Sequence, residues 1–154
     1  MARRVFFSFH YQKDIFRVNV IRNSHIVDGT AAAGFQDASL WEETKKKGDA
    51  AVKALINKGL ENTSVTVVLI GAETVNRKYV TYEIEQSIAR GNGLLGIHIN
   101  NIKDINGNKS LLPGRAPEAL RKTGAPVYTW DKDKFGKWVE MAYQQAQRKK
   151  SVLW

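Results

Sequence analysis

Cysteine is missing from the 154-residue chain. Its absence excludes a disulfide scaffold, a thiol nucleophile and every metal or iron–sulfur site built on thiolates. Long apolar runs are missing as well, since Val65–Ile70 and Leu94–Ile99 are far too short to span a bilayer. The apolar stretch Val5–Phe9 turns polar without a cleavage site, so it does not indicate a signal peptide. These absences favour a cytoplasmic protein with no membrane partner.

The sequence also lacks the short motifs of several common enzyme classes. Neither GxxxxGK[ST] nor GxGxxG occurs, which excludes a P-loop and a dinucleotide-binding glycine turn, and without GxSxG an α/β-hydrolase is unsupported. The three histidines, His10, His25 and His98, fall on different predicted elements without HxxxH or HxH spacing. We therefore expect no metal site.

Acidic residues are few relative to basic ones: 15 Asp and Glu against 24 Lys and Arg give a formal net charge of +9. The excess is spread out, with small clusters at Lys45–Lys47 and Arg148–Lys150 in helical patterns whose other face is apolar. No recognition-helix, zinc-finger or aromatic RNA-binding pattern accompanies it, so nucleic acid is not an expected partner. The positive field is equally compatible with attraction of a small polyanion such as a dinucleotide.

The hydrophobic pattern alternates between strands and helices, and no linker or repeat divides it, so we expect one domain over residues 1–154. The predicted strands are Arg4–Phe9, Ala33–Ser39, Ser64–Gly71, Leu94–Ile99 and Ala125–Trp130. The predicted helices are Asp14–Val27, Trp41–Leu60, Arg77–Arg90 and Asp133–Gln147, with a short one near Pro117–Lys122 inside the long loop Asn100–Gly124.

Strands that alternate with helices pair in parallel through right-handed crossovers and carry helices on both faces of the sheet. Five such strands favour a flavodoxin-like, three-layer α/β fold with a parallel sheet of order 2-1-3-4-5. In that fold the functional site lies beyond the carboxyl ends of the strands. The segments that follow those ends are Ser8–Tyr11, Asp37–Trp41, Gly71–Thr74 and Asn100–Asn101.

Glu83 is the most informative carboxylate, because it lies in the helix predicted after the buried strand Ser64–Gly71. Its neighbours Val80 and Ile84 belong to the apolar face of that helix, and a carboxylate at such an edge is partly desolvated. From spacing alone, a surface glutamate paired with a nearby Arg or Lys is the favoured interpretation. A carboxylate that faces the cleft is the alternative.

Four blocks of sequence together resemble one family. Arg4–Phe9 resembles the opening strand of TIR domains, and Arg77–Ile84 resembles the TIR helix motif in which Trp-Cys precedes two variable residues and a Glu. Here Tyr79-Val80 replaces Trp-Cys, and the Glu position is Glu83. The blocks FFSFHYQKD, AAGFQDASLWEE, SVTVVLIGAET and RKYVTYEIEQSIARGNGLLGIHI are similar to the ThsB family, TIR-like proteins of bacterial Thoeris antiphage systems.

The resemblance implies an enzyme that processes NAD as its substrate and needs no further cofactor. Glu83 is then the catalytic carboxylate, which stabilises the oxocarbenium ion formed when the nicotinamide–ribose bond breaks. The implied substrate-binding residues are Phe7, Ser8, Phe9, His10, Tyr11, Asp37, Trp41 and Tyr79. Simpler roles stay open for several of them, because strand aromatics can be core and Asp37 can cap the helix that follows it.

The resemblance further implies a cyclic ADP-ribose-type product that is made when a phage infection is sensed and that activates a separate effector protein. It also implies a phage-derived activator, and self-association that completes the site. Two alternatives remain. One is a non-catalytic TIR-like module for protein–protein interaction, which the missing Trp-Cys pair keeps open; the other is a nucleoside deoxyribosyltransferase-like enzyme, which shares the fold type and a catalytic Glu.

Overall fold

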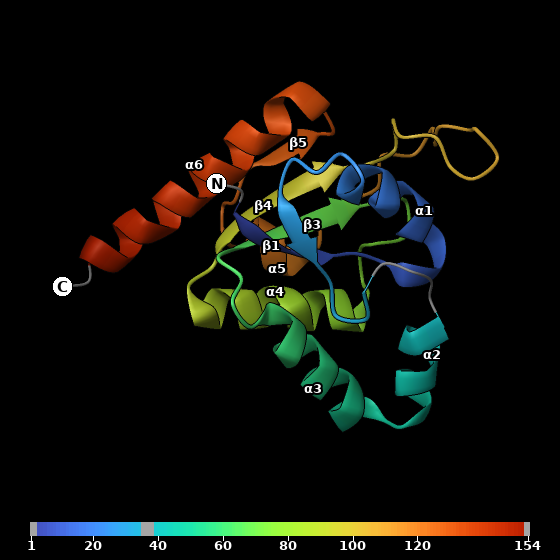
Figure 1. The fold of residues 1–154 in the computed structure, drawn as a ribbon, viewed down its shortest axis with the longest axis horizontal. Coiled ribbons are helices and arrows are strands. Elements are labelled where there is room, and N and C mark those ends of the chain that lie inside the picture. Colours follow the sequence, from blue (N-terminus) through green and yellow to red (C-terminus); the bar gives the residue numbers. More distant parts are fainter. Residues whose placement is uncertain (1–2, 35–38, 153–154) are drawn as a thin grey trace.

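A five-stranded parallel sheet with strand order β2-β1-β3-β4-β5 forms the centre of the molecule (Figure 1). The computed structural model describes residues 3–34 and 39–152 of the chain. The strands are β1 (Arg4–Ser8), β2 (Asp28–Thr30), β3 (Val65–Ile70), β4 (Gly93–His98) and β5 (Val127–Thr129). This arrangement confirms the predicted flavodoxin-like α/β fold.

Helices cover both faces of the sheet. They are α1 (Tyr11–Arg22), α2 (Ser39–Lys46), α3 (Asp49–Leu60), α4 (Lys78–Arg90), α5 (Glu118–Arg121) and α6 (Lys132–Val152). In Figure 1, α1 and α6 lie on one side of the sheet, α3 and α4 lie on the other, and α2 lies beside α3. The three layers expected for the fold are therefore present.

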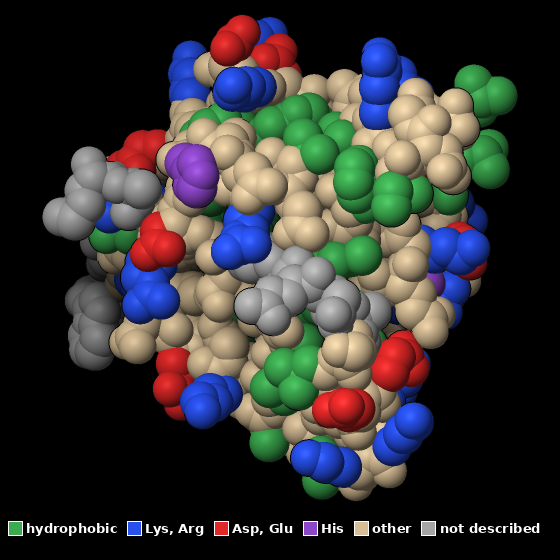
Figure 2. Space-filling model, turned by 45° about the vertical axis from the view of Figure 1, so that its right-hand side comes forward, with side chains coloured by type: hydrophobic (Ala, Val, Ile, Leu, Met, Phe, Trp, Pro, Cys, Tyr) green, Lys and Arg blue, Asp and Glu red, His purple; other side chains and the backbone are tan. Residues whose placement is uncertain are grey.

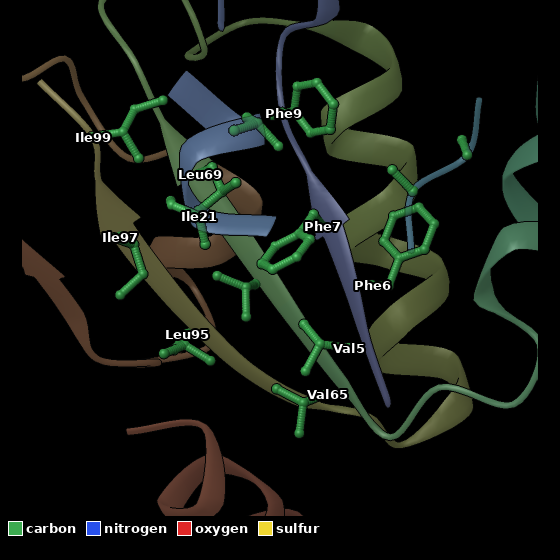
Figure 3. Close-up of a cluster of buried hydrophobic side chains, with 14 of the residues drawn as sticks. Val5, Phe6, Phe7, Phe9, Ile21, Val65, Leu69, Leu95, Ile97 and Ile99 are labelled. Carbon is green, nitrogen blue, oxygen red and sulfur yellow. The ribbon is translucent and has the colours of Figure 1, made fainter. Parts of the chain in front are cut away.

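β1 contributes side chains to both helical layers. Phe6 and Phe7 are each 0% exposed, because the side chains of a strand alternate between the two faces of its sheet. Figure 3 shows Phe7 on the same side of the sheet as Ile21 of α1, whereas Phe6 lies on the opposite side, close to Gly59 of α3. Ser8 has the same parity as Phe6, so the alternation directs its hydroxyl group towards the α4 layer.

The second strand is β2, and its prediction at Ala33–Ser39 was wrong. β2 is an edge strand of Asp, Gly and Thr that pairs with the first three residues of β1. Such a strand is defined by its pairing partner and carries no apolar run of its own. Of the predicted range, Ala33 is buried in the turn that follows β2, and Ser39 is the first residue of α2. Residues 35–38 lie outside the described part of the chain.

One predicted helix is divided in two. Trp41–Leu60 forms α2 and α3, which are separated at Gly48, where φ is +107°. Glycine adopts this backbone conformation without the strain that a side chain would cause. The first helix begins at Tyr11 and ends at Arg22, earlier at both ends than predicted. The short helix in the loop before β5 and the terminal helix are confirmed as α5 and α6.

The surface carries a mixture of charges. On the face shown in Figure 2, Lys and Arg side chains are interspersed with Asp and Glu rather than gathered into one basic area. Exposed pairs such as Lys53–Asp49 at 3.1 Å and Lys13–Glu73 at 3.4 Å account for part of this pattern. None of the helices in the described part of the chain combines the length and apolar character that a membrane crossing requires.

Candidate active site

Glu83 lies in the middle of α4, on the helix face that packs inward. That face consists of Val80, Glu83, Ile84 and Ser87, at the spacing of successive helical turns. Glu83 is 1% exposed, and Ser8 Oγ donates a hydrogen bond of 2.6 Å to its Oε1 atom. The other oxygen, Oε2, is buried without a hydrogen-bond partner among the described residues. The surface ion pair that spacing alone favoured is wrong, because the apolar register of α4 turns Glu83 inward.

Burial makes the carboxyl group of Glu83 a much weaker acid than an exposed glutamate. Desolvation raises its pKa to about 8, while the hydrogen bond from Ser8 acts in the opposite direction. At pH 7 the unliganded carboxyl group is therefore largely protonated. A ligand that brings hydroxyl donors or positive charge to Oε2 stabilises the carboxylate form and lowers this pKa.

A cavity of about 210 Å³ lies beside Glu83 at the carboxyl edge of the sheet. Its lining comes from the connection of β1 to α1, from the first residues of α1, from α2, and from the first half of α4 with the residue before it. The lining residues are Phe9, His10, Tyr11, Gln12, Trp41, Glu42, Lys45, Arg77, Lys78, Tyr79, Val80 and Glu83. Another cavity, of about 260 Å³, lies between α4 and α6, but its described lining residues include no Asp, Glu or His and offer no comparable chemistry.

Four aromatic rings form one wall of the first cavity. Tyr11 stacks on Trp41 with the ring centroids 4.7 Å apart and 11° between the ring planes. The ring centroids of Phe9 and Tyr11 are 4.3 Å apart, and those of Tyr79 and Trp41 are 5.5 Å apart in an edge-to-face arrangement. The backbone N–H of Ala33 donates a hydrogen bond of 2.8 Å to the Tyr11 hydroxyl group, which fixes the orientation of that ring. The wall therefore offers ordered apolar surfaces to a planar ligand.

The polar lining residues of the cavity include three cations, Lys45, Arg77 and Lys78. Arg77 and Lys78 stand at the beginning of α4, where Lys78 pairs with Asp49 of α3 at 2.8 Å. The Tyr79 hydroxyl group donates to the same carboxylate at 2.8 Å, so two contacts hold α3 against α4. Burial and the nearby Arg77 charge lower the pKa of His10. Within residues 3–34 and 39–152, no group of three or more His, Asp and Glu side chains is placed to hold a metal ion.

The structure brings most of the predicted site residues to this cavity. Those that line it are Phe9, His10, Tyr11, Trp41, Tyr79 and Glu83. Ser8 lies directly behind the lining, in contact with Glu83. The prediction of Phe7 as a substrate-binding residue is corrected by the structure. Phe7 is fully buried on the other face of the sheet and stacks on Phe135 of α6, with the ring centroids 6.4 Å apart. We assign it to the core. Asp37 lies outside the described residues.

Spacing did not single out Asp14, a second buried carboxyl group near the site. Asp14 is 2% exposed, and burial raises its pKa to about 6. Thr74 Oγ1 lies 3.5 Å from its Oδ2 atom and accepts a hydrogen bond of 2.8 Å from the Gly71 backbone N–H. Asp14 therefore braces the loop between β3 and α4. The available signal was its helical spacing with Val18 and Ile21, which places it on the buried face of α1.

Five polar residues of the cavity were also not expected as site residues. They are Gln12, Glu42, Lys45, Arg77 and Lys78. Arg77 and Lys78 belong to the sequence block that carries Glu83, so their closeness to the site could have been inferred from the helix start. Gln12 could not, because its position depends on a contact between α1 and α2, where its side-chain amide donates to Glu42 at 3.0 Å.

The sequence that forms this cavity matches known proteins. A family model described as Thoeris protein ThsB, TIR-like domain, matches residues 6–104, a segment that contains every residue lining the cavity. A protein of Bacillus cereus (strain MSX-D12) named "Putative cyclic ADP-D-ribose synthase ThsB1" is 61% identical over 110 residues. The aligned part is 70% of this chain and 57% of that protein, so the chain matches little more than half of its relative's length. The chain belongs to the TIR-like ThsB family of Thoeris proteins.

Proposed function

We propose that the chain is an NAD-processing enzyme of antiphage defence, which cleaves the nicotinamide–ribose bond and makes a cyclic ADP-ribose-type signal. The observation that carries this proposal is the buried carboxyl group of Glu83, whose unpartnered Oε2 atom belongs to a residue lining the cavity. The name of the Bacillus cereus relative, "Putative cyclic ADP-D-ribose synthase ThsB1", supports the same reaction.

The chemistry of NAD cleavage fits a site with one buried carboxylate. The nicotinamide ring of NAD is already cationic and leaves as a neutral molecule, so its departure needs no strong general acid. Positive charge then develops on the ribose as an oxocarbenium ion. A fixed carboxylate in a site that excludes water stabilises this charge strongly, as it does in glycoside hydrolysis. In our proposal Glu83 supplies that carboxylate, and its Oε2 atom accepts a ribose hydroxyl group.

The size of the cavity limits which part of NAD it holds. Pockets that enclose a whole drug-sized ligand measure about 300–1,000 Å³, whereas this cavity measures about 210 Å³. We infer that the nicotinamide–ribose end enters it and lies against the wall of Phe9, Tyr11, Trp41 and Tyr79. The diphosphate and the adenosine half then extend towards Lys45, Arg77 and Lys78, whose positive charges favour a dianion.

The remaining features of the proposal concern partners. NAD is the substrate, and no further cofactor is required. The cyclic product activates a separate effector protein, a phage-derived molecule stimulates the enzyme, and self-association completes the site. The reaction takes place in the cytoplasm. Each of these statements rests on the proposed NAD-processing function.

The proposal is tested by incubating the purified chain with NAD, alone and with lysate of phage-infected cells. Nicotinamide release and ADP-ribose products are followed by mass spectrometry. We expect nicotinamide and a cyclic product in at least the lysate condition. If neither condition consumes NAD, and a Glu83→Gln variant still protects cells against phage, the chain acts instead as a non-catalytic interaction module.

A further inference from the structure

His10 lies in the same cavity as Glu83 but belongs to a different element. It follows β1 and is the N-cap residue of α1, with an extended backbone (φ −84°, ψ 105°), and its side chain makes no capping hydrogen bond. The imidazole ring is half-buried. An N-cap side chain that is not used for capping, and that borders a cavity, is available to a ligand.

The other acidic groups of the cavity are already engaged. Glu42 accepts a hydrogen bond of 3.0 Å from Gln12 and lies 3.7 Å from the Lys45 ammonium group. Glu83 is buried and, in the proposed reaction, faces the ribosyl cation. A carboxylate that neutralises that cation is a poor acceptor for a proton released elsewhere in the substrate.

The phenol groups and the cations of the cavity are not bases near pH 7. Burial raises the pKa of both Tyr11 and Tyr79, so both remain protonated. Lys45, Arg77 and Lys78 carry positive charge. Among the described residues that line the cavity, His10 therefore remains as the candidate base, because its imidazole ring carries a neutral, basic nitrogen.

The charges around His10 explain why it stays neutral. Burial and the positive charges of Arg77, Lys13 and Lys45 lower its pKa, and Glu73 opposes them. Lys13 belongs to α1, Lys45 to α2, and Glu73 and Arg77 to the connection of β3 to α4. The other charged or titratable lining residues are Tyr11 of α1, Glu42 of α2, and Lys78, Tyr79 and Glu83 of α4. The neutral imidazole keeps a lone pair that can accept a proton, and the lowered pKa favours release of that proton to solvent afterwards.

We propose that His10 is the general base of ring closure, which accepts the proton lost by the internal nucleophile when the cyclic product forms. This inference rests on the proposed function. The bond between the ribose C1 atom and nicotinamide breaks, and its electron pair goes to the nicotinamide nitrogen, which becomes neutral. An O–H or N–H group in the adenosine half of the same molecule attacks C1. The new bond forms, and the proton moves to an imidazole nitrogen of His10 and then to water.

This role separates cyclisation from cleavage. Loss of nicotinamide releases no proton, so cleavage does not need the base. A water molecule that captures the cation instead can pass its proton to other water, and the product is then linear ADP-ribose. An internal nucleophile that folds back against C1 takes the place of that water molecule, so its proton passes to the protein base that borders the cavity. Removal of the base should therefore redirect the product rather than stop the reaction.

The test compares wild-type protein with the variants His10→Asn and His25→Asn. Asparagine is a favoured N-cap residue, so the first substitution preserves the start of α1. His25 is an exposed residue with φ of 55°, a conformation that asparagine tolerates, and it lies outside the cavity. Thermal unfolding confirms that each variant is folded. Nicotinamide, cyclic product and linear ADP-ribose are then quantified after reaction with NAD and lysate.

We expect His10→Asn to lower the ratio of cyclic to linear product by about tenfold or more, while nicotinamide release continues. His25→Asn should give the wild-type ratio. Acidification should lower the ratio for wild-type protein, as His10 becomes protonated, and leave it unchanged for His10→Asn. An unchanged ratio in folded His10→Asn, or complete loss of nicotinamide release in that variant, overturns the proposed role of His10 and leaves the proposed function of the chain standing. A wild-type protein that releases no nicotinamide overturns the proposed function as well.

Discussion

Replacement of Glu83 by Gln should change how the stability of the protein depends on pH. The carboxyl group of Glu83 ionises at its ordinary pKa of 4.5 in the unfolded chain and near 8 in the folded protein. Between these values the folded state keeps a proton that the unfolded state has lost, so stability falls as the pH rises. At 1.36 kcal/mol per pKa unit, the wild-type protein loses about 5 kcal/mol of unfolding free energy by the time the pH exceeds 8. About 1 kcal/mol of this loss has already occurred at pH 5.

Glutamine has nearly the same shape but does not titrate, so the variant should avoid this loss. Its amide group lacks an acceptor beside the buried Oε2 position, and this adds a penalty of about 1–3 kcal/mol that does not depend on pH. We therefore expect the stability of Glu83→Gln relative to wild type to increase by about 4 kcal/mol from pH 5 to pH 9. The measurement is urea unfolding at pH 5, 7 and 9.

Glu85→Gln is the matched control, because Glu85 lies on the same helix but is exposed. Its unfolding free energy should follow that of the wild-type protein at each pH. If the curves of all three proteins run parallel, Glu83 ionises in the folded protein as it does in water. The argument for a buried, protonated carboxyl group would then be refuted.

Three further predictions concern the surroundings of Glu83 and the sheet. Ser8→Ala removes the hydrogen bond that lowers the pKa of Glu83, so the rising limb of NAD cleavage against pH should move to higher pH and the rate at pH 7 should fall by about tenfold. Trp41→Ala removes a ring that stacks on Tyr11, which should raise KM for NAD and lower the free energy of unfolding by about 3–5 kcal/mol; Trp41→Phe should restore most of both. Gly93→Ala would place its Cβ 2.5 Å from a backbone oxygen of α6, and thermal unfolding should show a loss of about 2 kcal/mol.

The order of the sheet could be predicted from sequence because its central strands are buried on both faces. All six residues of β3 are 0% exposed, and its continuous run of apolar and β-branched residues admits few other interpretations. β2 gives no such signal, since it is held at the edge by its pairing with β1. The break between α2 and α3 was equally hard to predict, because Gly48 is compatible with a helix end and with a helix interior at some cost.

The burial of Glu83 could not be predicted from the spacing of residues in the sequence. The apolar neighbours Val80 and Ile84 indicate a position at the edge of the buried face, but they do not decide whether the carboxyl group points to solvent. That depends on Ser8, which lies 75 residues away in sequence and presents its hydroxyl group at the end of β1. The location of the site was predictable from the carboxyl ends of the strands, whereas the pairing inside it required the three-dimensional fold.

Aromatic residues of β1 illustrate the same distinction. Alternation predicts that Phe6 and Phe7 face opposite layers, but it does not say which layer holds the site. The structure places Phe7 against Phe135 of α6, and it places Phe9, two residues on, at the cavity. Phe9 lies beyond the end of β1, so the strict alternation no longer applies to it.

The central claim, that Glu83 is the catalytic carboxylate of NAD cleavage, is tested most directly by the rate of nicotinamide release. Wild type, Glu83→Gln and Glu85→Gln are compared at saturating NAD with lysate of infected cells present. We predict that Glu83→Gln lowers the rate by about 10²–10³-fold, or about 3–4 kcal/mol of activation free energy, while Glu85→Gln leaves it unchanged. A folded Glu83→Gln variant that releases nicotinamide as fast as Glu85→Gln would contradict that claim.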